Sequence, residues 1–133
     1  MSEPAVKIRL DGNGRSHCPG ETLSGEFSLE SVADDEIKSI ELSVLWYTNG
    51  KGDADMAVHD FRRVAGDDNG AVASCGPHRF TTVLPNSPLT YDGVILNLRW
   101  CVRVRAYLAR GREVVGQQQF RLGTVPPAKA VAP

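Results

Sequence analysis

Alternation of apolar and polar side chains is clearest between Leu98 and Leu108. Every second position of this segment is apolar, and the positions between them carry three arginines, a cysteine and a tyrosine. Successive side chains of a β-strand point to opposite faces, so the pattern predicts a strand with one apolar face and one basic face. A shift of one residue would bury three arginines, at a cost of roughly several kcal/mol each. We therefore expect Trp100 to point inward and the arginines to point outward.

Other segments of the chain repeat this two-residue period. They are separated by turns rich in Gly, Pro, Asn and Asp at intervals of about 8–12 residues, and no amphipathic helix of useful length lies between them. The chain is therefore expected to be all-β, with an immunoglobulin-like antiparallel β-sandwich of about seven or eight strands in a single domain. We assign residues 1–123 to this sandwich. Residues 124–133, small residues and proline with little to bury, are expected to form a disordered tail.

Two irregularities qualify the pattern. Leu45 breaks the alternation of the segment 40–47, which suggests that the outer face is partly covered there. Between Val58 and Phe61 the period slips by one residue, which indicates a bulge or an edge strand. Trp46 and Trp100 both fall on apolar faces, and we expect them to meet near the centre of the core.

Composition excludes several classes of function. The 133 residues carry a formal net charge of -1, which argues against a general nucleic-acid-binding protein. There is no run of about 18 apolar residues, so no membrane span is expected. Three cysteines do not suggest a disulfide framework, and the first residues lack the pattern of a secretory signal. Together these features favour a reducing, cytoplasmic location.

Three stretches, taken together, resemble the arrestin-like superfamily. They are Pro19–Phe27, Ile37–Leu42 and Phe80–Val104, the last containing Leu84-Pro85 and the triplet Tyr91-Asp92-Gly93. The resemblance implies a sandwich like the arrestin N-terminal domain, in a single-domain member of bacterial type. It also implies a non-catalytic role in protein binding or scaffolding, although a fold by itself does not fix a function.

The chain departs from the family pattern in two respects. Arrestins have two such sandwiches in tandem, whereas this sequence has room for one and contains no second copy of the pattern. The segment Thr124–Pro127 has prolines but no tyrosine, so a Pro-Tyr ligase-recruiting motif is not supported. No phosphate-sensing residue of the family is carried over to this chain.

Candidates for catalysis or metal binding are weak. One candidate is a tetrahedral zinc site formed by His17, Cys18, Cys75 and His78, if their loops met. His17 and Cys18 are adjacent, however, so their side chains would point in opposite directions in an extended chain. A cysteine nucleophile needs a histidine within reach, and no nucleophile elbow occurs. The acidic turn 67–70 lacks the spacing of a calcium loop. We therefore predict no catalytic residue, no metal site and no cofactor, and we expect that the protein is not an enzyme.

The concentrated basic stripe of the chain consists of Arg99, Arg103, Arg105 and Tyr107, with Arg62 and Arg63 as further candidates. One interpretation is a solvated sheet face, with the arginines paired to Glu26, Glu30 and Glu41 from neighbouring strands. The other is a docking face for an acidic or phosphorylated protein, since arginine forks suit carboxylate and phosphate groups.

The leading hypothesis is a non-catalytic protein-binding or scaffolding module. A homodimer formed through an exposed sheet edge or a flat face is a further expectation. The alternative is a sandwich that binds a small molecule or a carbohydrate, which would call for exposed aromatic side chains.

Overall fold

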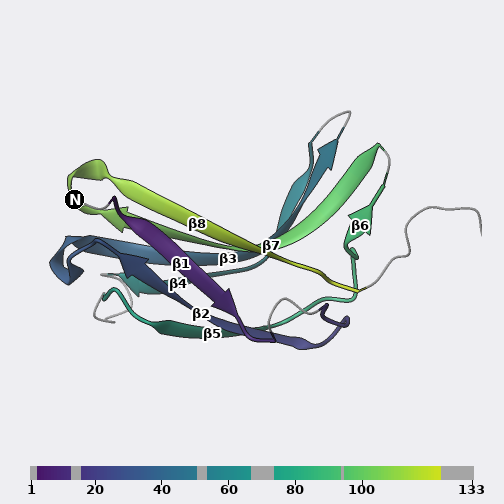
Figure 1. Ribbon diagram of the computed structural model, residues 1–133, viewed down its shortest axis with the longest axis horizontal. Coiled ribbons are helices and arrows are strands. Elements are labelled where there is room, and N and C mark those ends of the chain that lie inside the picture. The colour runs from purple at the N-terminus through teal and green to yellow at the C-terminus, as the bar shows by residue number, and fades with distance from the viewer. Residues whose placement is uncertain (1–2, 13–15, 51–53, 67–73, 94, 124–133) are drawn as a thin grey trace, which may run out of the picture.

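A computed structural model describes residues 3–12, 16–50, 54–66, 74–93 and 95–123. Within these ranges, eight strands form two antiparallel sheets that pack face to face, and the helical turns are two short 3-10 turns (Figure 1). The all-β antiparallel sandwich predicted from the alternation is therefore confirmed. The tail predicted at 124–133 and the turn at 67–70 lie outside the described residues.

The two sheets differ in size. The smaller sheet has the strand order β1, β2, β5, with bounds Ala5–Leu10, Thr22–Glu30 and His78–Val83. The larger sheet has the order β4, β3, β7, β6, and β8 also pairs with β7. Its bounds are Met56–Gly66, Ile37–Gly50, Leu96–Leu108, Tyr91–Asp92 and Glu113–Phe120. The 3-10 turns are Asp34–Glu36 and Ala109–Gly111.

The core lies between the sheets, and β7 supplies much of it. Trp100, Val102, Val104, Ala106 and Leu108 are all buried, whereas the arginines between them are not. This is the inward and outward division that the alternation predicts. Burying each large apolar side chain contributes roughly 1.5–3 kcal/mol, which fixes the register of the strand.

The two tryptophans are neighbours, but they are not equally buried. Trp46 lies opposite Trp100 in the β3–β7 register. Trp100 is 1% exposed, and its indole Nε1 donates a hydrogen bond to the Pro88 carbonyl at 2.7 Å. Trp46 is only half-buried and packs against the edge of the core. We expected both side chains to lie near the centre of the core. This is correct for Trp100, whereas Trp46 lies at the edge of the core.

Both predicted irregularities are present. Leu45 and Cys101 face each other in the register and are buried on the outer face of the larger sheet. In the β3–β4 ladder, Val44 pairs with Asp60 and Leu45 pairs with Val58, so the residue between those two partners bulges out. β4 is also the edge strand of its sheet.

Side chains join the sheets along one side of the sandwich. Asp60 on β4 accepts a hydrogen bond from the Thr82 hydroxyl on β5 at 2.7 Å, and His59 Nε2 lies 2.8 Å from the Val83 carbonyl oxygen. On the other side, β1 passes close to β8 (Figure 1), where a Cβ on Gly116 would come within 2.7 Å of the Val6 side chain.

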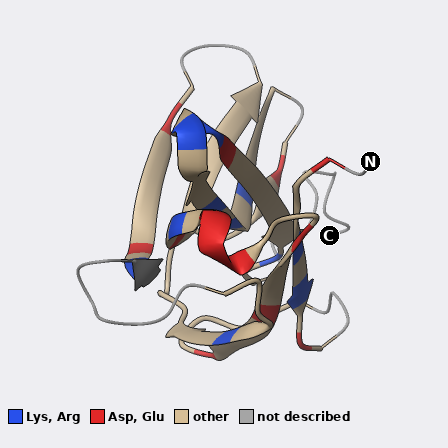
Figure 2. Ribbon diagram, turned by 90° about the vertical axis from the view of Figure 1, so that its left-hand side faces the viewer, with Lys and Arg blue, Asp and Glu red and all other residues tan. Residues whose placement is uncertain are grey.

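Charged residues are distributed over the whole molecule. Basic and acidic segments are interspersed along the strands and turns (Figure 2), in keeping with the small net charge of the chain. None of the described residues forms a helix with the length and apolar character needed to span a membrane.

A candidate docking face on the five-stranded sheet

The four residues of the basic stripe all lie on the outer face of β7. Arg99, Arg103, Arg105 and Tyr107 are half-buried and alternate with the inward-facing core residues. Their partners come from three neighbouring elements, so the stripe is held in place but its members are not equivalent.

Arg99 is neutralised by a carboxylate. Its Nη1 lies 2.6 Å from Asp92 Oδ1, and it also donates to the Tyr91 carbonyl at 3.2 Å. Arg121 approaches the other oxygen of Asp92 at 3.0 Å. The hydrogen bond from Arg121 and the proximity of Arg99 lower the pKa of Asp92. Arg99 therefore has a structural ion-pair partner.

Arg103 has a neutral partner. Its Nε and Nη2 donate to the Gln117 side-chain oxygen at 3.3 and 3.2 Å. An amide oxygen satisfies part of the guanidinium fork but carries no countercharge. Among the described residues, no carboxylate forms an ion pair with Arg103. Its charge is therefore available to an acidic ligand.

Arg105 belongs to a chain of polar contacts. A hydrogen bond to Tyr107, followed by the nearby charges of Glu113 and Glu41, raises the pKa of Arg105. The Tyr107 hydroxyl donates to Glu41 Oε1 at 3.2 Å. Arg105 Nε is buried and has no hydrogen-bond partner in the described part of the chain. A buried N–H group without a partner costs roughly 1–3 kcal/mol.

Three parts of the sequence interpretation are wrong. Glu26 and Glu30 lie on β2 in the other sheet, where Glu26 forms an ion pair with Arg9. They do not pair with the arginines of the stripe, because alternation along one strand does not reveal which strands become neighbours. Arg62 lies on β4 opposite the buried Leu42, and it pairs with Asp60 rather than joining the outer face.

Arg63 and Glu41 do lie beside the stripe. Arg63 pairs with Glu41 in the β3–β4 register, and its Nη2 is 3.5 Å from Glu41 Oε2. Of the three glutamates proposed as partners, Glu41 alone is on a strand next to β7.

The registers of β4, β3 and β7 place the outward side chains in rows across the sheet. Each row contains one residue from β4, one from β3 and one from β7. The rows are Arg63, Glu41 and Arg105; Phe61, Ser43 and Arg103; and Val58, Leu45 and Cys101. The face therefore has an apolar side on β4 and a basic side on β7.

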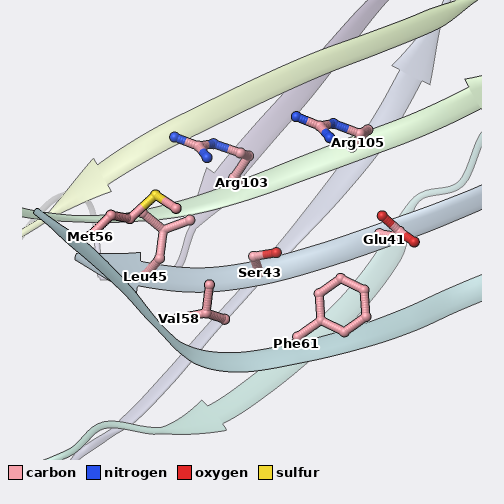
Figure 3. A pocket seen from close by; sticks show the side chains of 8 residues that line it. All are labelled: Glu41, Ser43, Leu45, Met56, Val58, Phe61, Arg103 and Arg105. Carbon is pink, nitrogen blue, oxygen red and sulfur yellow. The ribbon is translucent and has the colours of Figure 1, made fainter. Parts of the chain in front are cut away.

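A pocket of about 210 Å³ lies on this face. Figure 3 shows its apolar side chains on β4 and β3, with Arg103 and Arg105 reaching out from β7 and Ser43 between the two sides. Ser43 has the shortest side chain in its row, between a phenylalanine and an arginine, which explains why the surface is hollow at this position. The remaining lining residues are Glu41, Leu45, Met56, Val58 and Phe61.

Sequence reasoning missed the apolar side of the pocket. Met56, Val58 and Phe61 are 54%, 50% and 56% exposed, respectively. An alternating strand normally turns such residues toward the core, so alternation alone does not place them on the outer face. The available signal was the slip after Val58, since a bulge changes which face the following residues occupy.

The cysteines and histidines are distributed among separate contacts. Cys75 lies beside Val32 and Asp34, and burial raises the pKa of its thiol. His78 stacks on Phe27 with ring centroids 5.0 Å apart. The described residues include no group of three or more His, Cys, Asp or Glu side chains placed to hold a metal ion.

His17 lies in a different part of the fold from Cys75. It bridges to Leu122, is almost fully buried, and approaches Phe120 edge-on with ring centroids 5.9 Å apart. Its Nδ1 is 3.3 Å from Glu21 Oε2 but does not meet hydrogen-bond geometry. The arrangement fits a packed histidine at the end of the sandwich.

The architecture of the two sheets is that of an arrestin-like fold. The chain is similar to Spo0M, a sporulation control protein from Bacillus subtilis, with a TM-score of 0.66 and 17% sequence identity. The match covers 94% of this chain and 51% of the Spo0M chain, so the chain spans about half the length of Spo0M. The resemblance noted in the sequence is therefore confirmed for the fold.

A second solved structure is similar over most of its length. The superoxide reductase (neelaredoxin) from Ignicoccus hospitalis matches with a TM-score of 0.52 and 12% identity, covering 90% of this chain and 80% of that protein. At these identities both likenesses concern the fold alone. No protein-family model matches the sequence, and no curated protein matches it.

Proposed function

We propose that this protein is a non-catalytic binding module that docks a protein partner on the outer face of its five-stranded sheet. The observation that carries the proposal is the second row of that face. There, the half-exposed Phe61 lies on one side of the short Ser43 and Arg103 lies on the other. Arg103 has the neutral Gln117 amide, and no carboxylate, as its side-chain partner among the described residues.

The combination is typical of protein interfaces. Exposed aromatic and arginine side chains are enriched at such interfaces, and arginine combines hydrogen bonding with charge. Phe61, Val58 and Met56 form a continuous apolar side on one strand, whereas isolated apolar residues on a surface need no explanation. The arginines favour a partner with an acidic surface.

The alternative, a module that binds a carbohydrate or another small molecule, has less support. Such modules present aromatic platforms, but Trp100 is buried and hydrogen-bonded and Trp46 packs against the core. The pocket on the outer face also has basic side chains along one side only.

Site-specific photo-crosslinking in the source cells tests the proposal. A photoreactive phenylalanine analogue replaces Phe61 in one variant and Thr81, an exposed residue on β5 of the other sheet, in the control. We expect discrete protein adducts from position 61 and none from position 81. The adducts should weaken when Arg103 and Arg105 are changed to Glu.

The outcomes of this experiment are distinct. Adducts of equal yield from both positions, or none from position 61, would contradict docking on this face. An adduct of twice the mass of the chain would identify the partner as a second copy of the protein.

A further inference from the structure

The outer face of the larger sheet is shaped as a short trough. β3 forms its floor, where Ser43 has the shortest of the lining side chains, and the side chains of β4 and β7 form its two walls (Figure 3). Neighbouring strands lie about 4.8 Å apart, so the two walls are about 10 Å apart at their backbones. An α-helix with side chains is about 10–12 Å wide and would rest on top of the walls. A single extended chain can reach the floor.

The two walls have different chemistry. Phe61 and Val58 make the β4 wall apolar, and both side chains are half-exposed. Arg103 and Arg105 make the β7 wall cationic. Anything that lies along the floor therefore meets apolar groups on one side and guanidinium groups on the other.

Arg103 has donor capacity left over. Its Nε and Nη2 share the single neutral side-chain oxygen of Gln117, which leaves other N–H groups of the guanidinium for a ligand. Arg105 is half-buried and contributes positive charge to the same wall. The carboxylate at one end of the trough, Glu41, is already engaged by Arg63 and by the Tyr107 hydroxyl. A carboxylate from outside would thus supply the countercharge that Arg103 lacks in the described part of the chain.

The spacing along the trough matches that of an extended peptide. Successive rows are two residues apart on β3, which is about 6.6–6.8 Å. Side chains of an extended peptide also repeat on each side every two residues. If the pleat of the peptide lies parallel to the sheet, odd side chains point to one wall and even side chains to the other.

We infer that the docking face binds an extended segment of a partner protein in which acidic and apolar residues alternate. The acidic side chains contact Arg103 and Arg105, and the apolar side chains contact Phe61 and Val58. This inference rests on the proposed function and specifies the chemistry of the partner segment. The feature that the docking face recognises is then the two-residue alternation of acidic and apolar side chains in the partner segment, rather than the overall acidity of that segment.

Two peptides of identical composition test the inference. One is Glu-Leu-Glu-Leu-Glu and the other is its isomer Glu-Glu-Glu-Leu-Leu, both with blocked termini and a fluorescent label. Binding to the full chain is followed by fluorescence anisotropy. We expect the alternating peptide to bind about tenfold more tightly than its isomer, because the isomer can satisfy only one wall fully.

Four variants locate the binding. Arg103→Gln and Phe61→Ser each remove part of one wall, and Ser43→Tyr fills the floor without changing charge. Arg79→Gln is the matched control, since it removes an arginine that pairs with Asp11 on the other sheet. The first three should weaken the alternating peptide about tenfold or more, and the control should leave it unchanged. Circular dichroism of each variant verifies that the fold is retained.

The possible failures separate this inference from the proposed function. Equal binding of the two isomers, both dependent on Arg103, would overturn the alternating register but leave protein docking intact. Absence of binding by either peptide, or equal losses in Arg79→Gln and Arg103→Gln, would also overturn the inference. The proposed function itself fails only in the photo-crosslinking experiment, if position 61 gives no adduct or if positions 61 and 81 give adducts of equal yield.

Discussion

Trp100 shows how one residue links sequence pattern, packing and a local hydrogen bond. It occupies an apolar position of β7, is almost fully buried, and reaches the Pro88 carbonyl with its indole nitrogen. It also contacts Phe120 and His59, with ring centroids 5.9 and 6.1 Å away, respectively. Its burial was predictable from alternation, but its partners were not, because they come from segments distant in sequence.

Replacing Trp100 with alanine should therefore lower the free energy of unfolding by about 3–5 kcal/mol, through lost burial and the cavity that remains. The measurement is equilibrium denaturation by urea. Phe61→Ala is the matched control, because its side chain is 56% exposed and its loss should cost less than about 1 kcal/mol. A loss below about 1 kcal/mol for Trp100→Ala would contradict its place in the core.

At the scale of the elements, strand positions were predictable but strand neighbours were not. Alternation predicted a strand between Leu98 and Leu108, and β7 spans Leu96–Leu108. Alternation could not show that Glu26 lies on β2 in the other sheet, which is why Glu26 was wrongly paired with the stripe. The same distinction applies to the docking face. The outward position of its arginines can be predicted from the alternation of β7 alone. The position of its apolar wall depends on a bulge in β4 and on the pairing of β4 with β3.

The contact between β1 and β8 depends on a residue without a side chain. A Cβ at Gly116 would lie 2.7 Å from the Val6 Cβ and 3.0 Å from the Val6 carbonyl oxygen. The backbone oxygen cannot move aside without shifting the strand. Gly116→Ala should therefore destabilise the fold by about 1–3 kcal/mol.

Thermal or urea unfolding of Gly116→Ala against Gln118→Ala, an exposed position on the same strand, isolates this effect. The glutamine variant should differ from the wild type by less than about 0.5 kcal/mol. A Gly116→Ala protein as stable as the wild type would show that β1 and β8 can separate at no cost.

Contacts between the two sheets hold the whole molecule together. One of them involves a charged side chain: Asp60 on β4 accepts a hydrogen bond from Thr82 on β5. Burial favours the neutral acid, but hydrogen bonds from Thr82 and Arg62 outweigh it, so the pKa of Asp60 is lowered in the folded chain. The pKa of Asp92 is lowered as well, chiefly by Arg121. A carboxylate with a lowered native pKa stabilises the fold above its unfolded pKa of about 3.9, and this contribution is lost as the pH falls through the native pKa.

Stability should therefore fall as the pH drops from about 5 to about 3. The fall in the free energy of unfolding should be smaller in Asp60→Asn than in the wild type, because the amide does not titrate. Urea denaturation at a series of pH values measures it. Asp35→Asn, which changes an exposed carboxylate in a turn, is the matched control and should keep the wild-type slope. Equal slopes for Asp60→Asn and the wild type would remove Asp60 from the acid response.

The side-chain hydrogen bonds between β4 and β5 also bear on self-assembly. A sheet border with free backbone groups is a template on which further chains can add, and many β-proteins must guard against such growth. Here His59 uses the carbonyl of Val83, and the kink at the bulge interrupts the straight run of β4. The same features that close this flank of the sandwich thus disfavour polymerisation into fibres along it.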